Sequence, residues 1–404
     1  MIHEAAVPRF PGLPADVDGS DAVVRVETRL SDVACVQPGS TPTTMAGRFQ
    51  AAVAAGALNL WGTPLRCIES ESEHASAAAA GSAAEAGRRV TTFTGGQGLV
   101  RMKEDLFVIA GKRLPAVFHV GARTVASRAH DVQAGHDDVM AVADTGWGIL
   151  FARDAQEAAD LAAIARRVAE ATGTPFIVAQ DGFLTTQTLE NVALPEDDLL
   201  REFVGDPHDR VPYASDPAEA LSDAMARWTA LTGRRSGPVD AYRCADASEI
   251  LVAMGALAGT AITVVDRLRS MGRPVGYVAV TSFRPFPTSE LAAILHRARS
   301  IGVVERTDEP LAAANPLTRE IRAALYDAAA EGVLVPRVLS FSTGLGSRDV
   351  AAEDLVAVFD RLAHHGDQPT RHAVLGPTPA ALVPPTGDAL MGGPVSPDPE
   401  GVAR

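Results

Sequence analysis

The first half of the chain alternates short apolar runs with amphipathic helical patterns. Six runs are nearly continuous in apolar or β-branched residues and end at glycine, proline or a polar residue, as buried strands do: 33–37, 64–69, 89–94, 115–120, 148–152 and 175–180. Between the last two lies a helical pattern over 154–173, with Asp154 at its N-cap and Gly173 at its C-cap. Strands that alternate with helices predict parallel βαβ units and a doubly wound α/β sheet.

A second alternation of strands and helices follows a polar link. Its strands are expected at 249–254, 275–283, 301–306 and 333–341, and its helices at 260–272, 287–300 and 315–332. Beyond it, eight prolines and the absence of apolar periodicity predict an extended tail. We therefore expect a first domain over 1–232, a linker over 233–248, a second α/β domain over 249–365 and a proline-rich tail over 366–404.

The composition narrows the class of protein. Among 404 residues, 36 Lys+Arg face 50 Asp+Glu, and the formal charge of −14 disfavours a nucleic-acid partner held through its phosphates. The longest apolar stretch, 250–265, is interrupted by glycine and threonine, and the amino terminus lacks a signal-peptide pattern, so we expect no membrane span. Cys35, Cys67 and Cys244 are far apart and form no CxxC pair, which predicts a reducing, cytoplasmic setting and no metal site within this chain.

Three polar segments are candidates for chemistry. Three glutamates in 69–73 precede an alanine-rich helix whose small side chains allow a backbone or a cofactor ring to come close, although simple packing on a sheet is the commoner case. The glycines of FTGGQGLVRM (93–102) match neither a Walker loop nor GxGxxG, and they favour a tight strand-to-helix turn. Arg123 ends the strand of FHVGAR, at the edge where parallel sheets bind ligands, and can hold a carboxylate there. A surface arginine is the alternative.

Two further segments have a weaker connection to function. HDVQAGHDD (130–138) contains His130, His136, Asp137 and Asp138, but their spacing matches no metal motif, and a polar loop is expected. MGALAG (254–259) resembles part of a dinucleotide-binding turn without its third glycine, and we assign it no ligand.

Eight segments, in the same order, resemble the pyruvate:ferredoxin oxidoreductases and the related 2-oxo-acid:ferredoxin oxidoreductases. They are VDGSDAVVRVETRLSDVACVQPGSTPTTM (17–45), ESEHASAAAAG, TTFTGGQGL, LPAVFHVGAR, GHDDVMAVADTGW, AQDGFLTTQ, SFRPFP and VVERTDEP. The resemblance extends over residues 17–345 and implies a thiamine diphosphate enzyme. The first domain would be the pyrimidine-binding module, and the second would resemble the C-terminal domain of transketolase.

The resemblance also implies residues that bind the cofactor. Glu73 would bond N1′ of the aminopyrimidine and help to activate the cofactor, a task for which the carboxyl should be shielded from water by the alanines and glycines around it. Glu69 and Glu71 are poorer candidates because they come earlier in the turn. Gln97 and Gly98 would line the cofactor beside Glu73.

Substrate binding follows from the same resemblance. Arg123 corresponds to the arginine that binds the carboxylate of the 2-oxo acid through a charge-assisted bond. The family's substrate threonine corresponds to Ser40 or, with a shift of one residue, to Thr41. The turn QPGSTPTT departs from the family pattern, so pyruvate is the default substrate and the 2-oxo acid stays open.

Motifs that the sequence lacks predict its partners. The family binds the diphosphate and Mg²⁺ through a Gly-Asp-Gly…Asn motif on a separate module, and no Gly-Asp-Gly occurs in the 404 residues. The cysteine sets of the family's iron–sulfur clusters are also missing. We therefore expect an α-type subunit whose active site is completed by a β-type subunit that carries the diphosphate, the Mg²⁺ and the clusters. A γ-type subunit, ferredoxin and coenzyme A are further expected partners.

The leading hypothesis is oxidative decarboxylation of a 2-oxo acid. Two alternatives stay open: a non-redox thiamine diphosphate decarboxylase or carboligase in a biosynthetic pathway, and a catalytically silent scaffold that stabilises the β-type subunit. The β chain of a lipoate-linked 2-oxo-acid dehydrogenase shares the two-domain architecture, but the HDD and RPFP segments fit it poorly.

Overall fold

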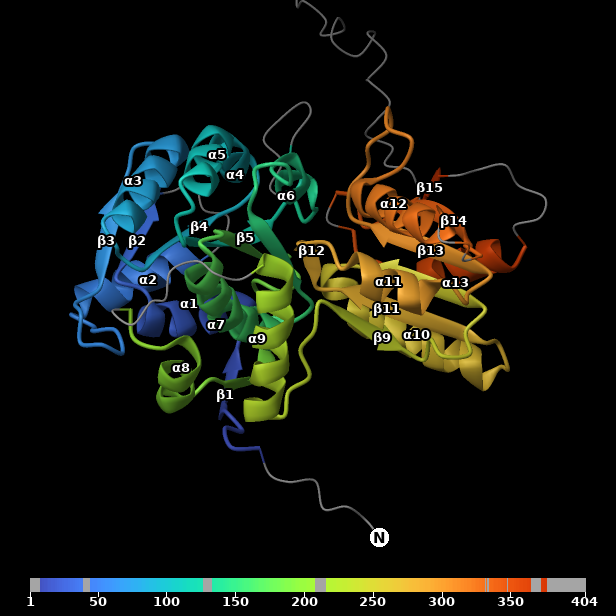
Figure 1. The fold of residues 1–404 in the computed structure, drawn as a ribbon, viewed down its shortest axis with the longest axis horizontal. Coiled ribbons are helices and arrows are strands. Elements are labelled where there is room, and N and C mark those ends of the chain that lie inside the picture. The colour runs from blue at the N-terminus through green and yellow to red at the C-terminus, as the bar shows by residue number, and fades with distance from the viewer. Residues whose placement is uncertain are drawn as a thin grey trace, which may run out of the picture.

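The computed structural model describes residues 8–38, 44–125, 133–207, 216–330, 332, 334–346, 348–364 and 372–375. Two large sheets and a two-stranded antiparallel sheet of Leu13–Val17 with Glu190–Leu194 organise these residues, and Figure 1 shows the first half of the chain on the left and the second half on the right. The first half contains β1 (Leu13–Val17), α1 (Gly19–Leu30), β2 (Val33–Val36), α2 (Met45–Ala54), β3 (Arg66–Glu69), α3 (Glu73–Glu85), β4 (Val90–Thr94), α4 (Gln97–Arg101), α5 (Lys103–Gly111), β5 (Val117–Ala122), α6 (Asp137–Ala141), β6 (Gly148–Ala152), α7 (Ala155–Thr172), β7 (Phe176–Asp181), β8 (Glu190–Leu194), α8 (Asp197–Val204) and α9 (Pro217–Thr232). The second half contains β9 (Val239–Tyr242), β10 (Glu249–Ala253), η2 (Gly255–Leu257), α10 (Ala258–Ser270), β11 (Val275–Val280), β12 (Ser282–Arg284), α11 (Thr288–Leu295), β13 (Ser300–Glu305), α12 (Pro316–Ala330), β14 (Arg337–Ser342), α13 (Ala352–Ala363) and β15 (His372–Val374).

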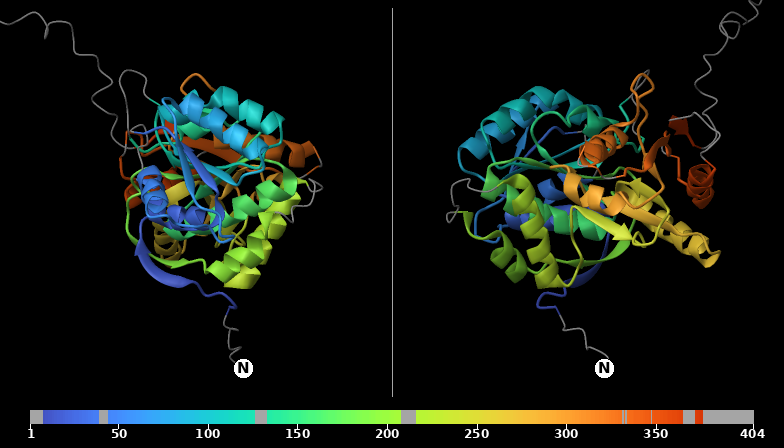
Figure 2. Two further views of the ribbon diagram at one scale, coloured as in Figure 1. Left: turned by 90° about the vertical axis from the view of Figure 1, so that its left-hand side faces the viewer. Right: turned by 45° about the vertical axis from the view of Figure 1, so that its right-hand side comes forward.

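The first sheet is covered by helices on both faces. Over the described residues its order is β12-β6-β7-β5-β4-β2-β3, and β2 to β7 are parallel. Successive side chains of a strand point to opposite faces. In β6, Leu150 and Ala152 therefore join the core formed with α1 and α7, whereas Ile149 and Phe151 join the core formed with α3 and α5. Figure 2 shows these helices on the two sides of the sheet. Burial of both faces explains the continuous apolar runs.

The second sheet has a similar plan. Its order in the described part of the chain is β15-β14-β13-β10-β11-β9, with all pairs parallel except β9 with β11. Helices α10 and α13 cover one face, and α11 and α12 cover the other. The apolar cluster that contains Ile149 continues into Ile250 and Val278 of this sheet, so the two halves share a packed core. Both halves are doubly wound α/β units, which confirms the predicted fold class.

One apolar run, 275–283, was expected to form a single strand but divides between the two sheets. β11 ends at Val280, and β12 pairs antiparallel with β6 of the first sheet. At the change-over, the N–H groups of Thr281 and Ser282 both donate to the carbonyl oxygen of Pro238, at 2.9 and 3.0 Å. A strand-forming run does not reveal which neighbour will accept its backbone bonds, so the prediction of one strand was wrong here.

The segment predicted as a proline-rich tail contributes a strand. His372–Val374 form β15, parallel to β14, and His372 Nε2 lies 3.0 Å from Asp308 Oδ1. Residues 376–404 lie outside the described residues. Among the helices that the structure describes, none combines the length and apolar character that crossing a membrane requires.

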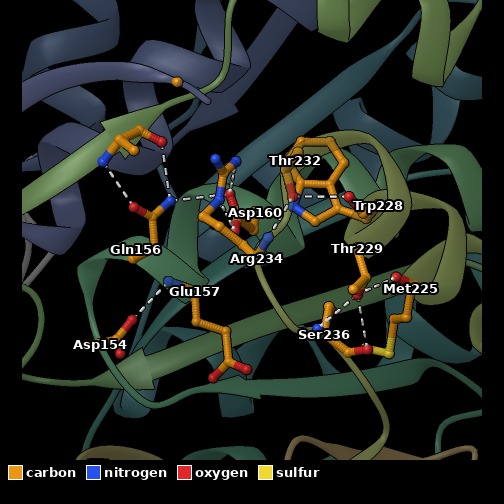
Figure 3. Close-up of polar contacts among 12 residues, drawn as sticks. Asp154, Gln156, Glu157, Asp160, Met225, Trp228, Thr229, Thr232, Arg234 and Ser236 are labelled. Carbon is orange, nitrogen blue, oxygen red and sulfur yellow. Dashed lines mark hydrogen bonds and ion pairs between the residues drawn. The ribbon is translucent and has the colours of Figure 1, made fainter. Parts of the chain in front are cut away.

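The start of the predicted linker is held against the first domain. Arg234 donates two hydrogen bonds to the Asp160 carboxylate of α7, at 2.8 and 2.9 Å (Figure 3). The Ser236 N–H donates to the hydroxyl of Thr229 on α9 at 2.9 Å. The Asp160 and Arg234 side chains are only 8% and 17% exposed. The pair therefore determines where the chain leaves the first domain.

Arg234→Ala should lower the free energy of unfolding by roughly 3–5 kcal/mol, because truncation leaves the buried Asp160 carboxylate without its cation. The neighbouring Arg235 provides a matched control, since its side chain is 74% exposed in its pair with Asp240. Arg235→Ala should cost about 0–1 kcal/mol. Urea unfolding followed by circular dichroism compares the two variants. Equal losses would show that the Asp160 contact does not stabilise the fold.

Candidate functional site

Glu73 is the buried member of the three glutamates that precede the alanine-rich helix. It is 4% exposed, whereas Glu69 and Glu71 are exposed. Glu73 is the first residue of α3, where the helix dipole favours a negative charge, and the hydroxyl of Ser72 caps that end. Both Glu73 carboxylate oxygens lie 3.3 Å from Nη1 of Arg101, whose side chain is 57% exposed. The carboxylate is thus shielded from water beside a cation at the surface.

A glycine turn approaches Glu73 from the end of β4. Gly96 has a φ of +60°, a conformation that favours glycine, and α4 begins at Gln97 directly after it. A Cβ on Gly98 would lie 2.8 Å from Thr94 Oγ1 and 3.2 Å from Glu73 Cγ, so a side chain there would displace one of these groups. The tight strand-to-helix turn forms as predicted and brings Gly98 against Glu73.

Arg123 directly follows β5 and is 1% exposed, so it is not the surface arginine that was the alternative. Its guanidinium carbon lies 3.8 Å from the centroid of the Phe183 ring. Burial lowers the pKa of Arg123 to about 10, which leaves the group positively charged at neutral pH. A Cβ on Gly96 would lie 3.6 Å from Arg123 Cβ. The same glycine turn therefore borders Glu73 on one side and Arg123 on the other.

Asp138 connects the glycine turn with Arg123. The segment that contains it was expected to be a polar loop, but 137–141 form the short helix α6, and Asp138 is fully buried. Its Oδ2 accepts the Gly96 N–H at 2.6 Å, and its own N–H donates to the carbonyl oxygen of Arg123 at 3.3 Å. Burial raises the pKa of Asp138 to about 8, although hydrogen bonds from the Gly96 and Val139 amides act in the opposite direction. His130 lies outside the described residues.

The raised pKa of Asp138 predicts that stability falls as the pH rises. The carboxyl ionises near pH 4 in the unfolded chain and near pH 8 in the folded chain, so the free energy of unfolding should decrease between these values. Each unit of pKa difference corresponds to about 1.4 kcal/mol. Asp138→Asn cannot ionise but keeps an oxygen acceptor for Gly96, and it should flatten this slope. Urea unfolding at about pH 5 and about pH 8 measures the pH dependence of the free energy of unfolding. The same dependence in Asp138→Asn as in the wild type would contradict a raised pKa of Asp138.

Ser40 and Thr41, the alternatives for the substrate hydroxyl, lie outside the described residues. Within the described ranges, no group of three or more His, Cys, Asp or Glu side chains could hold a metal ion. The three cysteines are free thiols. Burial raises the pKa of Cys35 to about 12 and those of Cys67 and Cys244 to about 11, so these thiols stay protonated at neutral pH.

Comparison with known families identifies the family of the chain. Residues 26–235 match the family model "Pyruvate flavodoxin/ferredoxin oxidoreductase, thiamine diP-bdg", and residues 247–355 match "Pyruvate:ferredoxin oxidoreductase core domain II". The chain belongs to the pyruvate flavodoxin/ferredoxin oxidoreductase family. The family predicted from the order of the sequence segments is thereby confirmed.

Members of the family differ in length. The pyruvate-flavodoxin oxidoreductase of Klebsiella pneumoniae is 33% identical over 381 residues, which are 86% of this chain and 32% of that protein. The protein of the same name from Nostoc sp. (strain ATCC 29151 / PCC 7119) is 30% identical over 391 residues, 89% of this chain and 96% of the relative. The chain thus spans about a third of the length of the Klebsiella and Escherichia coli relatives, and almost all of the Nostoc one.

Two solved structures have the same fold. A 2-oxoglutarate:ferredoxin oxidoreductase from Magnetococcus marinus is 18% identical, with a TM-score of 0.63 over 87% of this chain and 65% of that chain. A split gene transketolase is 14% identical, with a TM-score of 0.51 over 86% of this chain and 96% of that chain. These likenesses agree with a pyrimidine-binding domain of the family followed by a transketolase C-terminal-like domain.

The residues around Glu73 fit the pyrimidine end of thiamine diphosphate. A buried carboxylate at a helix end is suited to a ring nitrogen that binds a proton, and the absence of a side chain on Gly98 lets α4 pack directly against Glu73. Arg123 is a separate, buried cation suited to an anion. The individual roles of these residues stay predictions.

Proposed function

We propose that this chain is the part of a thiamine diphosphate-dependent 2-oxo-acid oxidoreductase that binds the cofactor's pyrimidine and the substrate's carboxylate. The observation that carries the proposal is a buried carboxylate, Glu73, and a buried guanidinium, Arg123, on the two sides of one glycine turn. The reaction is an oxidative decarboxylation. The C1–C2 bond of the 2-oxo acid breaks, carbon dioxide leaves, and the acyl carbon loses two electrons before the acyl group passes to coenzyme A.

Glu73 holds and moves a proton at N1′ of the aminopyrimidine. The bound cofactor supplies the nucleophilic carbon and stabilises the charge left when carbon dioxide departs. Because Glu73 is 4% exposed, its carboxyl exchanges this proton with the ring and not with bulk water. Gly98 lets α4 pack against the Glu73 side chain, and Gln97, the first residue of α4, lines the cofactor together with it.

Arg123 orients the substrate by binding its carboxylate with the planar guanidinium. The hydroxyl of Ser40 or Thr41 donates a hydrogen bond to the substrate. Pyruvate is the first 2-oxo acid to test because the relatives are named for it. 2-Oxoglutarate is the second, because it is bound in the Magnetococcus marinus structure.

A β-type partner chain supplies the rest of the active site. It carries the diphosphate and Mg²⁺ site and the iron–sulfur clusters, and ferredoxin or flavodoxin accepts the electrons. The proposed division follows the family resemblance, in which a Gly-Asp-Gly motif binds the diphosphate, and no Gly-Asp-Gly occurs in the 404 residues. Coenzyme A and a γ-type subunit complete the reaction, and a reducing cytoplasm suits the free cysteines.

The proposal is tested with the complex formed by this chain and the product of the adjacent gene, purified without oxygen. Reduction of an artificial electron acceptor is measured with pyruvate and with 2-oxoglutarate, each with and without thiamine diphosphate and coenzyme A. Reduction that requires both the cofactor and a 2-oxo acid is expected. Release of carbon dioxide without reduction of the acceptor would replace the proposal by a non-redox decarboxylase, and neither activity in an intact complex would replace it by a scaffold.

A further inference from the structure

The segment MGALAG of the second domain, which forms η2 and the start of α10, contacts the first domain. Gly255 has a φ of +72°, and a Cβ on it would lie 2.0 Å from Asp181 Oδ2. The next N–H, that of Ala256, donates to the same oxygen at 2.7 Å. By contrast, a Cβ on Gly259 would meet no atom within 4 Å. Gly255 is therefore required for the close approach of the second domain to Asp181.

Asp181 is a fully buried carboxylate at the carboxyl end of β7, and residues of both domains contact it. His136 Nε2 of the first domain lies 3.1 Å from Oδ1, and Arg306 Nε of the second domain lies 3.4 Å from it. The backbone adds a further contact, since the His136 N–H donates to the carbonyl oxygen of Arg306 at 3.0 Å. Figure 1 shows α6, which begins directly after His136, on the side of the first domain that faces the second.

The pKa of Asp181 agrees with a carboxylate that stays charged in this network. Burial alone would raise it, but His136, Arg306 and the Ala256 N–H together lower it to about 2. A buried charge of this kind is stable only while its partners stay in place. The contact between the domains and the conformation of the chain at Asp181 therefore depend on each other.

The two residues after Asp181 pack directly against Arg123. The Gly182 N–H donates to the carbonyl oxygen of Ala122 at 3.1 Å, and a Cβ on Gly182 would lie 2.9 Å from Arg123 Nε. Phe183 has a φ of +63°, which is uncommon for a residue with a side chain, and its N–H donates to Thr186 Oγ1 at 2.8 Å. This conformation places the Phe183 ring 3.8 Å from the Arg123 guanidinium carbon.

We propose that the second domain positions the carboxylate-binding arginine, Arg123. Gly255 and Arg306 of the second domain hold the Asp181 carboxylate, and residues 181–183 then hold the guanidinium of Arg123. Asp181 and Phe183 are positioning residues in this arrangement. The inference rests on the proposed function, in which Arg123 binds the 2-oxo acid. A misplacement of about 1 Å at such a group lowers activity by about 100-fold, so residues 181–183 need a rigid support.

Gly255→Ala is the direct test, and Gly259→Ala, four residues later at the start of α10, is its control. The methyl group of Gly255→Ala would displace the Asp181 carboxylate, and the KM for the 2-oxo acid in the complex should rise by roughly 10- to 100-fold. The affinity for thiamine diphosphate, which depends on the Glu73 side of the site, should stay the same. Gly259→Ala should behave as the wild type in both measurements. An unchanged KM in Gly255→Ala, or an equal loss of substrate and cofactor affinity, would overturn the proposal.

A pair of substitutions at Phe183 tests the last step without disturbing the domain contact. Phe183→Leu removes the aromatic ring beneath the guanidinium and should raise the KM by roughly 2- to 30-fold, whereas Phe183→Tyr keeps a ring and should not. Equal KM values for the two variants would overturn the role of Phe183.

The connection between Gly255 and Arg123 can also be measured without turnover. Hydrogen–deuterium exchange followed by mass spectrometry should show faster exchange over 117–125 and 176–186 in Gly255→Ala, but not in Gly259→Ala. No change in exchange would overturn the proposed connection whatever the activity. Inactivity of the wild-type complex with every 2-oxo acid, together with the expected change in exchange, would reject the proposed function and leave the contact standing.

Discussion

Replacing Glu73 with glutamine should reduce turnover of the assembled enzyme by roughly 100- to 10,000-fold, the range that a positioned general acid or base contributes. Glutamine has the same size as glutamate and should preserve the packing of this side chain against Gly98. The packing is close, because a Cβ on Gly98 would lie 3.2 Å from Glu73 Cγ. It cannot exchange a proton with the aminopyrimidine. The loss should therefore appear in kcat, while the variant still folds, assembles and binds thiamine diphosphate.

Glu71→Gln is the matched control for this experiment. Glu71 belongs to the same acidic segment but is exposed, so the variant should retain wild-type turnover. Steady-state kinetics with pyruvate, together with titration of the cofactor, separates the two substitutions. Full activity in Glu73→Gln would remove Glu73 from the mechanism, and loss of assembly in that variant would show a structural role instead.

Truncating Arg123 to alanine should lower kcat/KM for the 2-oxo acid by roughly 30-fold to several thousand-fold. The range corresponds to about 2–5 kcal/mol, the usual cost of removing one partner of a buried charge pair. Most of the effect should be a higher KM, because Arg123 is assigned to the carboxylate and not to the bond that breaks. The affinity for thiamine diphosphate should change little.

Two further measurements separate the charge of Arg123 from its shape. Arg123→Lys keeps the charge but loses the planar pair of donors. Its kcat/KM for the 2-oxo acid should therefore lie between those of the wild type and Arg123→Ala. Added guanidinium ion should restore part of the activity of Arg123→Ala. Arg88→Ala, at an exposed position of the same domain, is the control and should leave KM unchanged. A wild-type KM and rate in Arg123→Ala would reject the assigned role.

Local patterns in the sequence were sufficient for most of the first domain. The run 89–94 forms β4 over Val90–Thr94, and the pattern 154–173 forms α7 over Ala155–Thr172 between the predicted caps. The physical reason is that these elements are buried almost entirely, so their apolar composition and the residues that end them are visible in the local sequence. Where a strand changes its neighbour, as between β11 (VGYVAV) and β12 (SFR), the residues can mark the end of the apolar run but do not indicate which sheet the next strand joins.

The candidate site was accessible from the sequence only in part. The order of the segments indicated the family, and through it Glu73, Gly98 and Arg123. Burial then distinguished Glu73 from Glu71, two residues earlier in the same acidic segment. Asp138 carried a weak signal in the GHDD segment, but polar residues near a turn are usually solvated, so a loop was the natural prediction.

The residues that the sequence did not reveal act through partners far away along the chain. Asp138 accepts the N–H of Gly96, 42 residues away, and Asp181 accepts the N–H of Ala256, 75 residues away. Their identity is local, but their burial, their charge state and their hydrogen-bond partners exist only once the first domain has folded and, for Asp181, once the second domain has packed against it. Periodicity and segment order thus determine the fold class and the family. The support of Arg123 by the second domain follows from long-range packing, which no stretch of neighbouring residues encodes by itself.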